Sequence, residues 1–190
     1  MTLAASLTPL AFWFLRHGET DWNAQGLSQG NVDIPLNATG RAQALSAADM
    51  LRHRGIAAIV ASPLSRAYDT ALAAASVLGL PVEVDDGLRE VSFGAQEGQP
   101  MSQWFSDWVA GTFTPPDAES FAALRARAVA AVNRALARPA PVLVVAHGAL
   151  FRALRAEMGL EPNVRTPNAM PLFCEPGRPW SLTPAVQPVA

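Results

Sequence analysis

Two histidines, His17 and His147, are each followed by a glycine and preceded by a short apolar run. A neutral imidazole nitrogen is a competent nucleophile near pH 7, and a glycine beside it allows a substrate to approach the backbone closely. Arg16 directly precedes His17, and the planar guanidinium of arginine binds phosphate oxygens bidentately. These residue types predict transfer of a phosphoryl group to a histidine nitrogen.

Each histidine follows a segment with the length and apolar composition of a buried strand. Residues 10–15 are apolar and aromatic, and residues 141–146 (PVLVVA) give the clearest strand pattern in the chain. Further short strands are predicted at residues 56–61, 82–84, 170–174 and 180–183. A helix is predicted from residues 37–40 to Gly55, with Ala42, Leu45, Ala48 and Leu51 at helical spacing, and others are predicted over residues 64–78, 119–138 and 149–158.

This alternation of strands and helices indicates an α/β fold, a three-layer sandwich whose mostly parallel central sheet has helices on both faces. In such folds the ligand site lies beyond the carboxyl ends of the strands, where both histidines fall. Half of the 190 residues are hydrophobic, which suits a single domain over residues 1–190. Residues 85–116 have the composition of a loop with one short helix, and we expect a short cap segment over about residues 91–120.

The segment FLRHGETDWN at residues 14–23 closely resembles the Arg-His-Gly signature of the histidine phosphatase superfamily, the family of phosphoglycerate mutase and its phosphatase relatives. A lone Arg-His-Gly would be a weak signal, but the resemblance runs from about Phe12 to about Asn168 in five ordered motifs. The further matches are Gln29-Gly30 with Asp33, Pro35 and Leu36; Gly40 with Gln43-Ala44; residues 62–71 (SPLSRAYDTA); Arg89-Glu90 with Phe93-Gly94 and Glu97-Gly98; and residues 144–148 (VVAHG).

The resemblance implies a phosphoglycerate mutase-like fold and an enzyme in which His17 carries a phosphoryl group. It makes Arg16 and Arg66 the phosphate ligands and Asn23 a neutral donor to the same group. His147 is implied as a second imidazole that faces the transferring phosphoryl group. Phosphoryl transfer spreads negative charge over the equatorial oxygens, which fixed donors of these kinds stabilise.

Glu90 occupies the general acid position of the family, where it would protonate the leaving oxygen and later activate a water. His147 also precedes a predicted helix, whose positive end and free N–H groups would favour phosphate. Simpler structural interpretations stand beside these roles. Arg66 would then be a helix-surface arginine and Glu90 a solvated loop carboxylate. His53, in a polar helix end, is assigned no catalytic role, and Glu19 is interpreted as a residue that orients its loop.

Composition excludes several other classes of function. All fourteen basic residues are arginine, so neither a Schiff-base lysine nor a P-loop lysine exists. A net charge of −2 without basic runs gives no support for a nucleic-acid or membrane partner. No set of residues has metal-ligand spacing, so we predict neither metal nor cofactor. A single cysteine, Cys174, fits a reducing cytoplasmic location.

The predicted cap segment separates two activities of the family. A mutase must hold a second anionic group and shield the phosphohistidine from water, whereas residues 91–120 contain no Arg or Lys. We therefore predict a metal-independent phosphatase acting on a small phosphate monoester, with phosphoglycerate mutase-type transfer and a non-catalytic phospho-ligand-binding module as alternatives. The cap aromatics would contact an apolar leaving group, pack the cap on the core, or form the interface of a homodimer. These aromatics are Phe93, Trp104, Phe105, Trp108 and Phe113.

Overall fold

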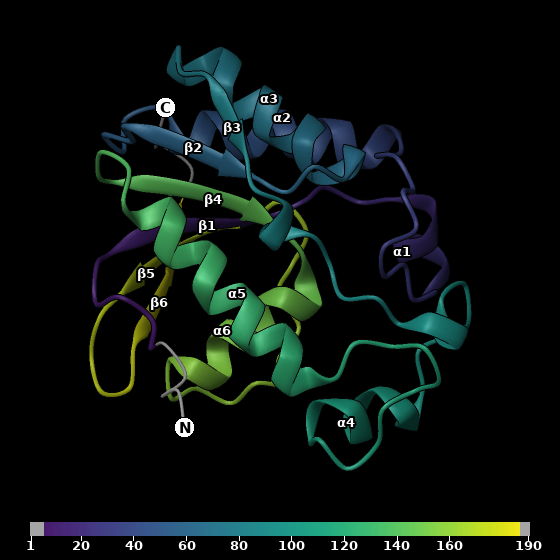
Figure 1. Ribbon diagram of the computed structural model, residues 1–190. Helices are drawn as coiled ribbons and strands as arrows, with labels where there is room; N and C mark the ends of the chain where they lie inside the picture. Colours follow the sequence, from purple (N-terminus) through teal and green to yellow (C-terminus); the bar gives the residue numbers. More distant parts are fainter. Residues whose placement is uncertain (1–5, 187–190) are drawn as a thin grey trace.

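A six-stranded sheet with the strand order β3-β2-β4-β1-β5-β6 forms the centre of the computed structural model, which describes residues 6–186 (Figure 1). The first four strands in that order are parallel, and β5 and β6 complete one edge in antiparallel pairing. This confirms the predicted mostly parallel sheet. The strands are β1 (Phe12–Arg16), β2 (Ala58–Ala61), β3 (Val82–Val84), β4 (Val142–Ala146), β5 (Pro171–Glu175) and β6 (Ser181–Pro184).

Alternate side chains of the central strands enter two separate hydrophobic cores, as the two-residue period of a strand requires. In β1, Phe12 and Phe14 pack into one core while Trp13 and Leu15 pack into the other. The side chains of β4 divide in the same way. Both faces of these strands are therefore buried, which is why their sequences form continuous apolar runs.

Helices cover both faces of the sheet, which confirms the three-layer α/β fold (Figure 1). Helices α2 (Ala38–Leu51) and α3 (Ser65–Leu78) pack together on one face, and α5 (Phe121–Leu136) and α6 (Gly148–Glu157) pack on the other. The predicted apolar stripe of α2 is partly wrong. Its buried face consists mainly of small residues, including Ala44 and Ala47, whereas Leu45 is 60% exposed.

Two short helices complete the set. Helix α1 (Asp21–Gln25) was not predicted, since five residues are too few to show a period; the side chain of Thr20 caps it. Helix α4 (Gln103–Val109) is the short helix expected within residues 85–116, and the 3-10 turns Asp86–Leu88 and Gly94–Gln96 accompany it. Among residues 6–186, no helix is long and apolar enough to cross a membrane.

Candidate active site

His17 and His147 lie side by side because they extend two neighbouring parallel strands. Each follows the last residue of its strand, β1 or β4, and the backbone N–H of His17 donates to the carbonyl of Ala146 at 3.1 Å. The two imidazole centroids are 5.3 Å apart, and both side chains are almost fully buried. The structure thus brings the two predicted histidines together at the carboxyl edge of the sheet.

The ring of His17 is oriented by a hydrogen bond to its own loop. Its Nδ1 lies 2.7 Å from the carbonyl oxygen of Gly18. Because that oxygen can only accept, Nδ1 carries the proton and Nε2 keeps its lone pair. Burial, with the charges of Arg66 and Arg16, holds the pKa of His17 well below 6.5. The imidazole is therefore neutral at pH 7, and its Nε2 has a lone pair available for bonding.

His147 is held by a hydroxyl that the sequence motif contains but that we assigned no role. Its Nε2 lies 2.7 Å from Oγ of Ser62, and Ser62 Oγ also accepts the N–H of Leu64 at 3.3 Å. The hydroxyl hydrogen of Ser62 is then available to donate to Nε2, which leaves the proton of His147 on Nδ1. Burial, with Arg66 and His17, keeps the pKa of His147 well below 6.5, so this neutral ring offers one N–H donor.

Arg16 and Arg66 enter the site from different elements and are anchored by backbone carbonyls. Arg16 ends β1 and donates from Nη1 to Thr166 at 2.6 Å. Arg66 lies in the first turn of α3 and donates to Val32 and Gly30, both at 2.8 Å. Burial lowers the pKa of Arg16 to about 10, so its guanidinium remains charged at neutral pH. Arg66 is fully buried, which excludes its alternative interpretation as a surface arginine.

Unpartnered donors are concentrated at this place. Among the described residues, the buried side-chain nitrogen and oxygen atoms without a hydrogen-bond partner are Nε of Arg16, Nε of Arg66, Nδ1 of His147 and Nε of Arg152. Buried polar groups normally have hydrogen-bond partners, because a buried donor or acceptor without a hydrogen bond costs about 1–3 kcal/mol of stability. All four of these atoms are nitrogens that donate in the protonation states described, so the site is built to receive acceptor oxygens.

Asn23 also belongs to the site. Its Oδ1 accepts from Nδ2 of Asn168 at 3.2 Å and from the backbone of Thr20 at 3.3 Å. These contacts fix the side-chain amide, and its Nδ2 donates to no other described residue. Asn23 lines the same cavity as His17, and its role as a donor to phosphate stays a prediction.

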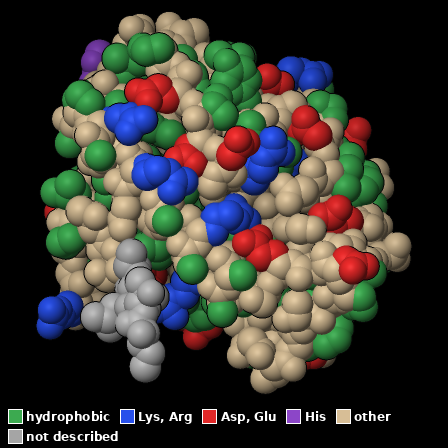
Figure 2. Space-filling model, viewed as in Figure 1, with side chains coloured by type: hydrophobic (Ala, Val, Ile, Leu, Met, Phe, Trp, Pro, Cys, Tyr) green, Lys and Arg blue, Asp and Glu red, His purple; other side chains and the backbone are tan. Residues whose placement is uncertain are grey.

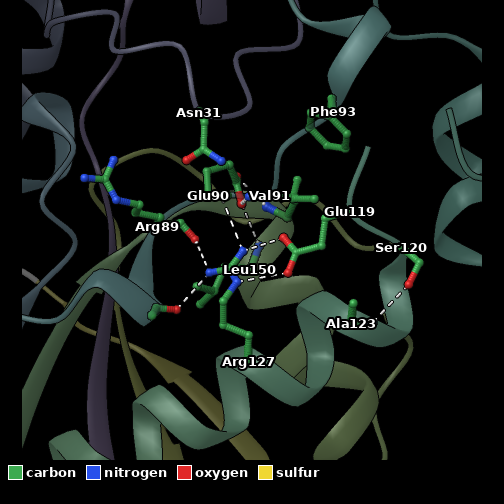
Figure 3. A network of polar contacts seen from close by, with 12 residues as sticks. Asn31, Arg89, Glu90, Val91, Phe93, Glu119, Ser120, Ala123, Arg127 and Leu150 are labelled. Atoms are coloured by element: carbon green, nitrogen blue, oxygen red, sulfur yellow. Dashed lines mark hydrogen bonds and ion pairs between the residues drawn. The ribbon is translucent and has the colours of Figure 1, made fainter. Parts of the chain in front are cut away.

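Glu90 is buried, which excludes the alternative of a solvated loop carboxylate. Its Oε2 accepts the backbone N–H of Ala149, and its Oε1 accepts those of Leu150 and Val91, at 2.9–3.1 Å (Figure 3). The prediction that the free amides at the start of α6 bind phosphate is therefore wrong for Ala149 and Leu150. A carboxylate of the chain itself already occupies the positive end of that helix.

Arg127 of α5 holds the loop that carries Glu90 (Figure 3). Its Nη1 donates to the carbonyls of Gly87 and Arg89 at 2.9 and 2.8 Å, and Nη2 lies 3.4 Å from the carbonyl of Glu90. The same guanidinium forms an ion pair with Glu119 at 2.6 Å. This contact between distant segments was not predicted, because nothing in the local sequence distinguishes Arg127 from the other arginines of α5.

The glycine beside His17 has a packing role that was not predicted. A Cβ atom at Gly18 would lie 2.3 Å from the carbonyl oxygen of Gly40, at the start of α2. Gly18 is therefore required for close packing of the loop on α2, and its predicted role in substrate approach stays a prediction. This also explains why Gly40 accompanies the Arg-His-Gly motif in the sequence.

The cavity at this edge has a volume of about 270 Å³. Phe93 and Phe105 of the predicted cap segment line it, whereas Trp108 is fully buried and packs against both rings. The aromatic residues therefore divide between cavity lining and packing. Arg152 and Arg165 also line the cavity and were not predicted, because they lie outside the motifs that we matched.

Charges elsewhere on the molecule are balanced. Basic and acidic side chains are interspersed on the face seen in Figure 2, where α5 lies. Arg125, Arg127 and Arg134 of α5, and Arg138 just after it, each pair with a carboxylate at 2.6–2.8 Å. Within residues 6–186, no three His, Cys, Asp or Glu side chains gather as a metal site.

Comparison with known proteins places this geometry in a family. Residues 12–169 match the model of the histidine phosphatase superfamily (branch 1). The chain is 38% identical over 160 residues to an uncharacterised phosphatase, PhoE, of Bacillus subtilis, which covers 82% of this chain and 81% of that one. It is 39% identical over 166 residues to a probable phosphoglycerate mutase, GpmB, of Yersinia enterocolitica, with coverage of 81% and 77%.

A solved structure agrees with these sequence matches. The mycobacterial glucosyl-3-phosphoglycerate phosphatase in complex with VO3 superposes with a TM-score of 0.79 at 32% identity, covering 92% of this chain and 97% of that one. The chain therefore belongs to the histidine phosphatase superfamily, in its branch 1.

Proposed function

We propose that the protein is a metal-independent phosphatase that hydrolyses a small phosphate monoester through a phosphohistidine on His17. The observation that carries this proposal is the set of unpartnered buried donors around a neutral imidazole. A phosphoryl group supplies oxygens to Nε of Arg16, Nε of Arg66 and Nδ1 of His147, and Nδ2 of Asn23 completes the set. A phosphoryl group combines several acceptor oxygens with the negative charge that two arginines require.

In the first step Nε2 of His17 attacks phosphorus, and the bond from phosphorus to the ester oxygen breaks. Glu90 gives its proton to the departing alkoxide. Since Oε1 of Glu90 accepts two backbone N–H groups and Oε2 accepts one, Oε2 keeps a lone pair that can carry the transferable proton. In the second step Glu90 takes a proton from water, whose oxygen attacks phosphorus and releases His17 and phosphate.

Hydrolysis is favoured over transfer to a second substrate oxygen by the cap segment. Residues 91–120 contain no Arg or Lys, and Phe93 and Phe105 line the cavity instead. Relatives named as phosphatases include PhoE and a glucosyl-3-phosphoglycerate phosphatase of Mycobacterium tuberculosis, 36% identical over 165 residues. Phosphoglycerate mutase-type transfer is the second candidate, because Arg152 and Arg165 supply positive charge from outside the cap.

The proposal is tested by phosphate release from an aryl phosphate and a panel of phosphorylated metabolites, with EDTA present. Wild-type protein should release phosphate, and His17→Ala should lose at least 99% of the activity. His53→Ala is the matched control, since His53 is an exposed histidine outside the cavity, and it should retain activity. Loss of release in EDTA, or residual activity above a few per cent in His17→Ala, would contradict the proposal.

Glu90→Gln separates proton donation from positioning. The variant should lose far more activity on alkyl phosphates than on aryl phosphates whose leaving group needs no proton. Equal losses on both substrates would make Glu90 structural. If wild-type protein releases no phosphate but converts 3-phosphoglycerate to its isomer, the mutase alternative holds, and binding without either reaction would support the phospho-ligand-binding module.

A further inference from the structure

The segment at residues 166–169, between α6 and β5, is fixed to the end of β1 at two points. The backbone carbonyl of Thr166 accepts from Nη1 of Arg16 at 2.6 Å, and the backbone N–H of Ala169 donates to the carbonyl of Arg16 at 3.0 Å. Thr166 and Ala169 are both buried. Ala169 has a φ of 49°, a left-handed conformation that an alanine keeps only where surrounding contacts hold it. Tertiary contacts therefore fix the backbone of this segment.

Asn168 lies between these two points, and its amide nitrogen contacts two residues of the site. Nδ2 donates to the backbone carbonyl of His17 at 3.0 Å and to Oδ1 of Asn23 at 3.2 Å. Because a carbonyl oxygen can only accept, the nitrogen of Asn168, and not its oxygen, faces His17. Both hydrogens of this amide are then used, one on each acceptor.

The orientation of the Asn23 amide follows from these contacts. Its Oδ1 accepts from Asn168 and from the backbone N–H of Thr20, so the oxygen faces two donors. The nitrogen then lies on the opposite side of the amide, where it donates to no described residue, and Asn23 lines the cavity. Turning the amide over would set its nitrogen against the two donors and its oxygen toward a bound anion.

The same donor also holds the peptide group that follows the nucleophile. The carbonyl of His17 accepts from Asn168, and the N–H of Gly18 in that peptide group donates to Oγ1 of Thr70 at 3.1 Å. Asn168 and Thr70 therefore fix one peptide group from both ends. The next carbonyl along the chain, that of Gly18, is the acceptor that orients the imidazole ring.

We propose that Asn168 is a positioning residue for phosphoryl transfer, which holds the Asn23 amide with its nitrogen toward the phosphoryl group and its oxygen away from it. Asn168 is not among the described residues that line the cavity, so it acts through Asn23 and not by contact with the substrate. The phosphoryl group is common to all phosphate monoesters, so the role does not depend on the leaving group. This proposal rests on the phosphatase function proposed above.

Replacement of Asn168 tests the contact in two ways. Asn168→Ala removes the donor and should lower kcat/KM for phosphate release about tenfold. Asn168→Asp keeps the size of the side chain but sets a carboxylate against two acceptors, so it should lower kcat/KM about 100-fold. Circular dichroism must show that each variant is folded, and Asn168→Asp keeps the test valid if Asn168→Ala is not. A folded Asn168→Asp with wild-type activity would overturn the proposal.

Asn163→Ala is the matched control. Asn163 is an exposed asparagine in the same connection between α6 and β5, its side chain contacts Ser106, and it does not line the cavity. The variant should keep wild-type activity. A loss equal to that of Asn168→Ala would contradict a specific role for Asn168.

A double-mutant cycle tests whether Asn168 acts through Asn23. In the Asn23→Ala background, Asn168→Ala should cause a loss at least about threefold smaller than in the wild-type background, because the amide that it holds is gone. Equal losses in both backgrounds would overturn the assignment. The loss from Asn168→Ala should also be equal on alkyl and aryl phosphates. A greater loss on alkyl phosphates would mean that Asn168 acts on protonation of the leaving group, against the proposal.

Binding of inorganic phosphate separates this proposal from the phosphatase function, because it needs no turnover. Calorimetry should give an affinity about fivefold lower for Asn168→Ala than for wild-type protein, and an unchanged affinity for Asn163→Ala. If phosphate binding weakens in this way but no ester is hydrolysed, the phosphatase proposal alone fails. If esters are hydrolysed and Asn168→Ala changes neither phosphate affinity nor kcat/KM, the positioning role alone fails.

Discussion

The arginines of α5 and those of the cavity have the same side chain in opposite surroundings. Arg125 and Arg134 of α5, and Arg138 just after it, lie near the surface, and each meets a carboxylate at 2.6–2.8 Å. In the cavity, Arg16 and Arg66 are buried and bind only backbone carbonyls, with one nitrogen of each left unpartnered. The difference indicates that the charge of the first group is satisfied internally, whereas the charge of the second is reserved for a ligand.

Replacement of a cavity arginine should produce the largest effect. Arg66→Gln should lower kcat/KM about 100- to 1,000-fold, because a fixed donor to the transferring phosphoryl group is lost. Steady-state phosphate release measures the effect. Since Arg66 also bonds the carbonyls of Gly30 and Val32, circular dichroism must show that the variant is folded. If Arg66→Gln is folded and keeps near wild-type activity, the charge of Arg66 is not needed for a ligand, and the proposed difference between the two groups of arginines is wrong.

Burial of the two histidines, together with the nearby arginine charges, should also make the folded protein sensitive to acid. Both His17 and His147 have a pKa well below 6.5 in the folded state, so below pH 6.5 the unfolded chain binds more protons than the folded one. The free energy of unfolding is therefore at its full value above pH 6.5 and falls below it, by up to about 1.4 kcal/mol per pH unit for each histidine.

Urea unfolding at pH 7.5 and 5.5 measures this loss. His147→Gln should reduce the difference between the two pH values, and replacement of the exposed His53 by Gln should not. The opposite pattern would show that the buried histidines do not control the acid response.

Arg127 sharpens the comparison, because it belongs to α5 yet reaches the site. Arg127→Met should lower kcat roughly tenfold, since the carbonyls of the loop before Glu90 lose their donor. The loss should be greater on alkyl than on aryl phosphates, because the loop positions the proton donor. Arg134→Met, on the same helix but paired with Asp85, is the control and should keep its activity. Equal kcat values for the two variants would show that Arg127 only pairs with Glu119.

The smallest effect is expected at the surface pairs themselves. Arg138→Gln should change the free energy of unfolding by less than about 1 kcal/mol and leave kcat/KM unchanged, because its pair with Glu83 is well exposed. Salt should weaken even that contribution. Thermal unfolding of Arg138→Gln and wild-type protein at two salt concentrations measures the contribution of the pair. A decrease of several kcal/mol in the free energy of unfolding would show that these pairs do more than balance charge.

The sequence was sufficient for the parts of the fold that depend on local pattern. Buried strands appear as apolar runs, so β1 and β4 and the two histidines that follow them were predicted in place. The face of α2 was misassigned, because alanine at every turn gives no strong stripe and the packing of α2 against α3 decides which residues are buried. Helix α1 is too short for its period to be visible.

Contacts between segments far apart in the chain could not be predicted from the sequence. The roles of Ser62 and Arg127 depend on which loop faces which helix, and Arg152 and Arg165 reach the cavity from a helix and a loop. The carboxylate of Glu90 on the amides of α6 likewise joins residues that lie 59 and 60 positions apart. Patterns within one segment do not contain this information.

The two imidazoles owe their separation to the ladder between β1 and β4, which continues through the backbone bond from His17 to Ala146. The spacing of hydrogen-bonded strands varies little among proteins. The cap segment, which adds Phe93, Met101 and Phe105 to the cavity lining, lies outside that ladder. Evolution can therefore exchange this outer segment and change which molecule is accepted while inheriting the same pair of histidines, so the reaction and its specificity are separable traits.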